Sequence, residues 1–213
     1  MTDGPGLTLV PLDCPSCGAS VAAHGADVVY YCTACRNGYR FDDESRSLIP
    51  VEVAFLSLPD RAVERYLPFW LQPATVTMAE RKAQGDVFRG LMSFFLGGDR
   101  TSPSGEGVFA VPAFDAPLDA VVRLTHAYTE ALPRLGEKLG ERLVGGCYGF
   151  DEIRKLAHFT LVATEVDKPD LLKDLSYTID FGEPRLLGVG FVRARDGWAD
   201  AVFGIEVPEP AAA

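Results

Sequence analysis

The chain has 213 residues, of which 47% are hydrophobic and 23% charged, so its composition excludes a disordered or a fibrous protein. Its formal net charge of −10 argues against a partner held mainly through phosphate groups. No segment approaches the roughly 20 apolar residues of a membrane span, and the first residues lack the pattern of a secretion signal, so we expect a soluble, cytoplasmic protein without membrane insertion.

Four of the five cysteines form two pairs near the start of the chain, each with two residues between its members. In a reducing cytosol such pairs are more typical of a metal site than of disulfides. Two residues between thiolates let one tight turn direct both sulfurs at one ion, and two such turns complete a tetrahedron, which suits Zn²⁺. We therefore predict one structural zinc ion, with Cys14, Cys17, Cys32 and Cys35 as its ligands.

The residues next to the cysteines predict short strands. Val28 to Tyr31 is a β-branched and aromatic run that leads into the second pair, and Tyr39 to Phe41 alternates after it. On the segments CPSCG and VVYYCTACRNGYRF, residues 10–45 resemble the zinc-ribbon superfamily. The resemblance implies a small antiparallel β unit pinned by one zinc ion, but no function, because ribbons serve in transcription factors, enzymes, ribosomal proteins and adapters. Since so small a unit cannot build its own core, we expect zinc removal to unfold it and to leave the larger domain folded.

Other interpretations of the cysteine pairs fit less well. A rubredoxin-like iron site usually has a longer segment between its pairs, and a thioredoxin-like pair needs a helix directly after it. Nucleic-acid binding is disfavoured because residues 1–50 contain three arginines against six acidic residues. His24 lies between the pairs and could replace a ligand, but with four cysteines available we expect it to face solvent.

We divide the chain into a zinc ribbon at residues 1–47, an α+β domain at residues 48–208 and a frayed tail at residues 209–213. The polar segment after Phe41 marks the first boundary, and residues 51–58 predict a strand.

The next segment, residues 61–78, is apolar and aromatic. Its two prolines, Pro68 and Pro73, predict extended chain at a sheet edge or a bulge. Three of its aromatic residues are expected in the core, with ligand stacking or partner binding as the alternative: Tyr66, Phe69 and Trp70.

The middle of the chain is less regular. Residues 79–98 combine near-helical apolar spacing with two glycines and predict no definite element. Residues 97–107 predict an exposed, mobile loop; a phosphate cradle there would lack the lysine of a P-loop, and phosphorylation of residues 100–104 stays open.

A strand is predicted at residues 108–114 and a helix from Asp115. The apolar face of this helix is expected to comprise Leu118, Val121, Val122, Thr125, Tyr128 and Leu132. On its other face His126 and Glu130 form an expected ion pair, with a second metal site as the alternative. The spacing of Leu135, Leu139 and Leu143 predicts a further amphipathic helix.

The fifth cysteine, Cys147, could be a nucleophile only if the fold supplied His126 or His158 as its base; otherwise it is a small buried side chain. Residues 150–156 predict a helix, with residues 159–163 as its continuation or a strand, and residues 169–175 predict a short helix. Three segments then predict an antiparallel meander: 177–181, 186–192 and 198–207.

The LPFW and VPAF segments and the terminal meander behind a ribbon are similar to bacterial zinc-ribbon proteins of no assigned role, a resemblance that implies no site residue. The predicted fold class is α+β, with a small N-terminal zinc ribbon followed by a mainly antiparallel-sheet domain with a few packed helices. We expect a non-enzymatic zinc-binding adapter or assembly protein that acts through protein–protein contacts. The alternatives are an enzyme with its site in residues 51–208 and a transcription-associated zinc-ribbon protein.

Overall fold

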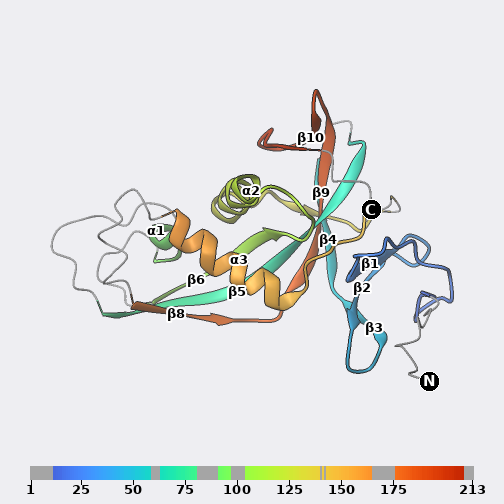
Figure 1. The fold of residues 1–213 in the computed structure, drawn as a ribbon, viewed down its shortest axis with the longest axis horizontal. Coiled ribbons are helices and arrows are strands. Elements are labelled where there is room, and N and C mark those ends of the chain that lie inside the picture. Colours follow the sequence, from blue (N-terminus) through green and yellow to red (C-terminus); the bar gives the residue numbers. More distant parts are fainter. Residues whose placement is uncertain are drawn as a thin grey trace, which may run out of the picture.

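The computed structural model describes residues 12–58, 63–80, 91–96, 104–139, 141, 143–164 and 176–208. It confirms the predicted α+β class: a three-stranded sheet adjoins a curled, mainly antiparallel sheet of eight strands, and three helices pack on the larger sheet (Figure 1).

The small sheet contains three antiparallel strands in the order β1 (Val29–Cys32), β2 (Asn37–Asp42) and β3 (Ser47–Val51). The first two match the predicted strands. The strand predicted at residues 51–58 is confirmed as β4 (Val53–Leu56) of the large sheet, but Val51 ends β3 and the chain turns at Glu52 between the two strands. The chain thus passes from one sheet to the other without a linker.

The large sheet is built around β5 (Arg65–Glu80), which pairs with β6 on one side and with β9 and β8 in succession on the other. Strand β9 also pairs with β4 and with β10. Its pairing with β4 is the one parallel pairing among the described strands. The remaining strands are β6 (Ser104–Pro112), β7 (Leu135–Gly136), β8 (Ser176–Phe181), β9 (Arg185–Ala194), β10 (Gly197–Asp200) and β11 (Glu206–Pro208).

The prediction that the two prolines of β5 lie at a sheet edge or a bulge is wrong, because β5 is a central strand of the large sheet. The Pro68 carbonyl accepts from Ala113 N at 2.9 Å, just beyond the end of β6. The Pro73 carbonyl accepts from Gly182 N at 2.8 Å, between the pairing of β5 with β9 and its pairing with β8. Each proline therefore lies where a neighbouring strand ends and no N–H is required.

The predicted loop at residues 97–107 is wrong in its last part, because residues 104–107 belong to β6. Gly105 is needed for close packing against α1 (Leu91–Phe95): a Cβ atom at this position would lie 1.7 Å from the Phe95 carbonyl oxygen. Glycine thus marks a close approach of backbones here, not a turn. Residues 97–103 lie outside the described residues, as do residues 81–90, the predicted helix at 169–175 and the tail at 209–213.

Two further predictions are wrong because they rested on local spacing. Leu135 begins the short strand β7 and Leu143 bridges Tyr66, so the described residues from 135 to 143 contain no helix. The terminal meander consists of other strands than predicted. Strands β9, β10 and β11 form it, whereas β8, at the first predicted segment, pairs with β5. Pairing partners of similar strands depend on contacts distant in sequence, which alternation does not encode.

Helix α2 (Leu118–Glu130) lies along β6, and its Thr129 hydroxyl accepts from Ala110 N at 3.1 Å. This contact satisfies an N–H on the strand's outer side, as edge protection requires. The expected apolar face is confirmed at Val121, Thr125 and Tyr128, but Leu118 is 51% exposed at the first turn. Helix α3 (Phe150–Ala163) is continuous, which confirms the continuation through residues 159–163.

The two faces of strand β1 pack in two different hydrophobic cores. Val29 and Tyr31 pack in the core of the large sheet, where the Tyr31 ring meets Phe55 edge-on at 5.4 Å. Tyr30 and Cys32, on the opposite face, pack in a small core of their own next to the other cysteines. Both Val28 N and Val29 N also donate to the carbonyl of Gly146, at 2.7 and 3.0 Å. The small sheet is therefore one wall of the main core.

A buried carboxylate organises the chain between β10 and β11. Asp200 is 1% exposed and accepts from the Tyr128 hydroxyl at 2.7 Å. It also accepts three backbone N–H bonds, from Val202, Phe203 and Ile205, at 3.0, 2.8 and 2.6 Å. This one side chain connects α2 to the turn after β10, and its four hydrogen bonds compensate for the cost of burying a carboxyl group.

Candidate metal centre

Two similar turns hold the four cysteines. In the first, Gly18 N donates to the Cys14 carbonyl at 2.8 Å; in the second, Arg36 N donates to the Cys32 carbonyl at 2.7 Å. Gly18 and Arg36 have positive φ angles of 72° and 60°, so each turn ends in the left-handed region. The second turn also joins β1 to β2, which fixes it to the small sheet.

The sulfur atoms lie close together, all within 4.8 Å of one another. Cys14 Sγ is 3.5 Å from Cys35 Sγ, and Cys17 Sγ is 3.6 Å from Cys32 Sγ. These separations are too long for disulfides, and all four cysteines are free thiols. A tetrahedron with metal–sulfur bonds of about 2.3 Å has edges of about 3.8 Å, so the cluster has dimensions that suit a four-sulfur metal site.

The close packing of the four thiols shifts the pKa values of Cys14 and Cys17 in opposite directions. Burial opposes ionisation of Cys14, but hydrogen bonds from Tyr39 and from backbone N–H groups outweigh it and lower its pKa to about 6. At Cys17 the Ala19 backbone lowers the pKa, but desolvation and the other sulfurs outweigh this and raise it to about 12. A divalent cation among the sulfurs would remove this repulsion and favour the thiolate form at every position.

His24 is not directed at the cluster. Its backbone N–H donates to Asp27 Oδ2 at 2.7 Å, and its ring Nδ1 lies 3.5 Å from the same oxygen. Half of its side chain is exposed, as expected for a residue that faces solvent.

The other candidate residues have separate surroundings in the described part of the chain. His126 Nε2 lies 3.4 Å from Glu130 Oε1, which confirms the predicted pairing. His158, on α3, contacts Tyr177 and Phe181 of β8. Burial, together with the charges of Asp115 and Asp27, raises the pKa of Cys147, the opposite of what a nucleophilic thiol needs.

The aromatic residues of β5 are confirmed as core residues: Tyr66, Phe69 and Trp70 are all buried. The Trp70 indole donates to the Tyr148 carbonyl at 2.9 Å; Trp70 is fully buried, whereas Tyr148 is half-buried.

Sequence reasoning missed two residues of the centre. Tyr39 was identified only as a strand residue, yet its hydroxyl lies 3.1 Å from Cys14 Sγ and 2.7 Å from the Ser16 hydroxyl. A signal was present, since Ser16 stands between the first two cysteines and Tyr39 follows Cys35 by four residues on a short strand.

The environment of His158 predicts a pH effect on stability. Burial lowers its pKa below the ordinary 6.5, and a charged imidazole would approach the Phe181 ring over which Arg154 already lies. The unfolded chain then binds the proton more readily, so stability is full above about pH 6.5 and is lost as the pH falls through the folded pKa. The urea midpoint should fall more between pH 7 and pH 5 for the wild type than for His158→Gln. Equal falls would contradict the assignment, and His126→Gln is the matched surface control.

Comparison of the chain with protein-family models, curated proteins and solved structures gives no match. Among the described helices, none has the length and apolar character needed to cross a bilayer.

Proposed function

We propose that the chain is a zinc-binding adapter or assembly protein of the cytoplasm, in which Cys14, Cys17, Cys32 and Cys35 hold one structural Zn²⁺. The observation that carries the proposal is the donor set: four sulfur atoms within 4.8 Å of one another. Four thiolates complete the tetrahedron that zinc prefers and leave no coordination position for water or substrate. Such a site stabilises structure and does not catalyse.

The position of the cluster supports a structural role. In the described part of the chain, the segment that carries the first cysteine pair also packs in the small core through Val21, Leu12 and Ala19. The second pair lies in the β1–β2 turn. A metal ion between them would join this segment to the sheet and thereby close the small core around Tyr30 and Tyr39.

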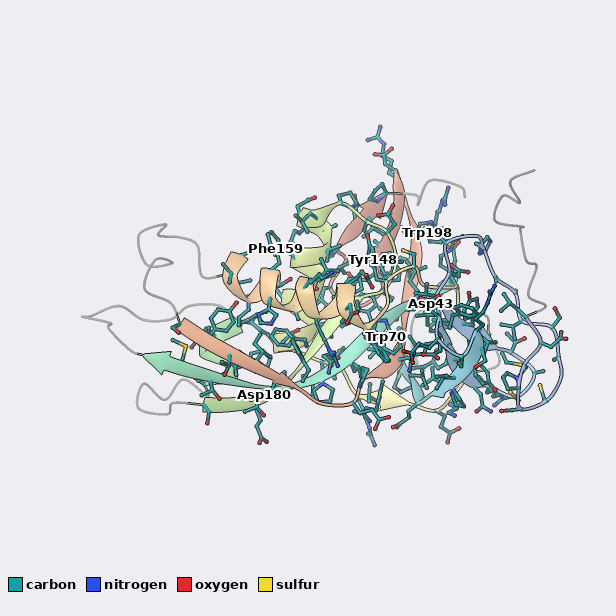
Figure 2. The ribbon with its side chains drawn as sticks, turned by 60° about the horizontal axis from the view of Figure 1, so that its bottom comes forward. Asp43, Trp70, Tyr148, Phe159, Asp180 and Trp198 are labelled. Atoms are coloured by element: carbon teal, nitrogen blue, oxygen red, sulfur yellow. The ribbon has the colours of Figure 1, made fainter. Side chains whose placement is uncertain are left out.

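The rest of the surface supports protein contacts. Four large apolar side chains are 39–51% exposed among the described residues: Phe94, Leu118, Phe159 and Phe203. Phe159 projects from α3, the helix that crosses one face of the large sheet (Figure 2). The net charge of −10 favours a partner with a basic surface over a nucleic acid.

Native mass spectrometry is expected to give one zinc ion per chain. Cys32→Ser should lose the metal, whereas Cys147→Ser, which changes the cysteine outside the cluster, should retain it. Iron in the purified protein, or a metal-free wild type, would contradict the zinc assignment.

The adapter role is tested by capture of partners on the tagged, zinc-loaded chain. We expect a stoichiometric protein partner whose recovery falls at least tenfold with Phe159→Ser and is unchanged with Lys155→Ser, an exposed residue on the same helix. No partner, or equal recovery with both variants, would count against this role for α3. A DNA titration at low salt should remain flat; salt-sensitive binding would favour the transcription-associated alternative.

A further inference from the structure

We infer that the Tyr39 hydroxyl donates a hydrogen bond to the Cys14 thiolate, and that this hydrogen bond raises the affinity of the cysteine cluster for its metal ion. The inference rests on the proposed metal site, and it assigns a role to a residue that is not itself a ligand.

The fold fixes Tyr39 rigidly. It lies in the middle strand of the small sheet, opposite Tyr30 of β1 and Pro50 of β3, and it is fully buried. Its hydroxyl oxygen lies 3.1 Å from Cys14 Sγ and 3.9 Å from Cys35 Sγ. The shorter distance is a good hydrogen bond to sulfur, so Cys14 is the main partner.

The chemistry of the bound state determines the direction of this hydrogen bond. A metal-bound thiolate can only accept, so the phenol O–H must donate to it. The Tyr39 hydroxyl donates to Ser16 Oγ at 2.7 Å. When its one proton is donated to a Cys14 thiolate instead, the Ser16 hydroxyl can donate to the phenol oxygen in turn. Ser16, Tyr39 and Cys14 then form a short chain in which each polar atom has a partner.

Burial explains why Cys14 needs such a donor. Cys14 and Cys32 are each 2% exposed, whereas Cys17 is exposed and can accept hydrogen bonds from water. Of the two buried sulfurs, the one of Cys14 lies within hydrogen-bond distance of the Tyr39 hydroxyl. Four thiolates around one Zn²⁺ carry a net charge of about −2, which is costly where water is excluded. Tyr39 supplies at the buried sulfur the hydrogen bond that water supplies at the exposed one.

The test compares Tyr39→Phe with Tyr30→Phe in the full chain, by competition for Zn²⁺ with a chelator of known affinity. Both variants keep the ring and remove one hydroxyl from the same small core, but the Tyr30 hydroxyl donates to the Asp27 carbonyl and not to a sulfur. Loss of a hydrogen bond to a metal ligand typically weakens metal binding by about 10- to 100-fold. We expect a loss of this size for Tyr39→Phe and less than about twofold for Tyr30→Phe.

A spectroscopic measurement separates hydrogen bonding from packing. In the Co²⁺-loaded protein, loss of a hydrogen bond makes the thiolate a better electron donor, so the sulfur-to-cobalt charge-transfer band of Tyr39→Phe should move to longer wavelength. The band of Tyr30→Phe should match that of the wild type. Equal affinities and unshifted bands in both variants would overturn the inference while leaving the metal site intact. A wild type that binds no metal would instead overturn the proposed function.

Ser16→Ala provides a second variant if Tyr39→Phe does not fold. Ser16 is on the exposed first turn, so its hydroxyl can be removed without a cavity in either core. We expect a several-fold weaker zinc affinity and a smaller shift of the same band in the same direction. A wild-type affinity and spectrum for Ser16→Ala, beside an unfolded Tyr39→Phe, would also overturn the inference.

Discussion

Zinc removal is expected to lower the stability of the large domain, and not only to unfold residues 10–45. The reason is the shared core: Val29 and Tyr31 of β1 pack with Phe55, Tyr66 and Trp70 of the large sheet. If the small sheet opens, these residues lose a buried partner surface. Removal of one large apolar side chain from a core costs about 2–5 kcal/mol, so loss of both contacts should destabilise the domain by several kcal/mol. That the larger domain stays folded without zinc remains a prediction, to which the shared core adds an expected loss of stability.

The two tryptophans make this measurement specific, since Trp70 and Trp198 both lie in the large sheet. Urea unfolding followed by tryptophan fluorescence therefore reports on the large sheet: Trp70 lies in the core shared with β1, and Trp198 lies in the other core of that sheet. Treatment with a chelator, or Cys32→Ser, should lower the fluorescence midpoint, and Cys147→Ser without chelator should not. An unchanged midpoint in the metal-free protein would show that the shared core contributes nothing to the larger domain.

Asp200→Ala is expected to destabilise the protein by about 3–5 kcal/mol, as the loss of a buried hydrogen-bonded network does. The substitution leaves three backbone N–H groups and the Tyr128 hydroxyl without their acceptor. Each unsatisfied buried donor costs about 1–3 kcal/mol, and partial rearrangement of the turn keeps the total below their sum. For a chain of this size the thermal midpoint should fall by roughly 6–20 °C.

Two variants isolate the contribution of the network. Tyr128→Phe removes only the hydroxyl and should cost about 1–2 kcal/mol. Asp180→Ala removes an exposed carboxylate from β8, on the side of the sheet away from α3 (Figure 2), and should change stability by less than about 0.5 kcal/mol. If Asp200→Ala matched Asp180→Ala, the turn after β10 would not depend on the carboxylate.

The sequence predicted those features that depend on neighbouring residues. The two cysteine pairs carry their own turn geometry, and the run from Val28 to Tyr31 has the composition of a strand. Helix α2 was predicted from its apolar spacing, although it begins at Leu118 and not at Asp115. In each of these cases the residues that determine the local structure lie within the same turn, strand or helix.

The features that the sequence did not predict depend on contacts between distant segments. Pro68 and Pro73 suggest an edge strand until the ends of the neighbouring strands are known. Gly105 suggests a loop until Phe95 is placed against it. The role of Tyr39 depends on a contact across 25 residues of sequence with Cys14. Local patterns specify the elements, but pairing and packing decide which element meets which.

The two-sided packing of β1 limits how the small sheet can be exchanged or excised. A unit joined to its neighbour only by a linker could be replaced without regard to strand register. Here a one-residue insertion before Val29 would exchange the two faces and place Tyr30 and Cys32 toward Phe55. A chain cut between residues 47 and 48 would also divide β3 and uncover the apolar ring of Phe55. The small sheet therefore shares one core with the large sheet, and fragments for expression should retain both.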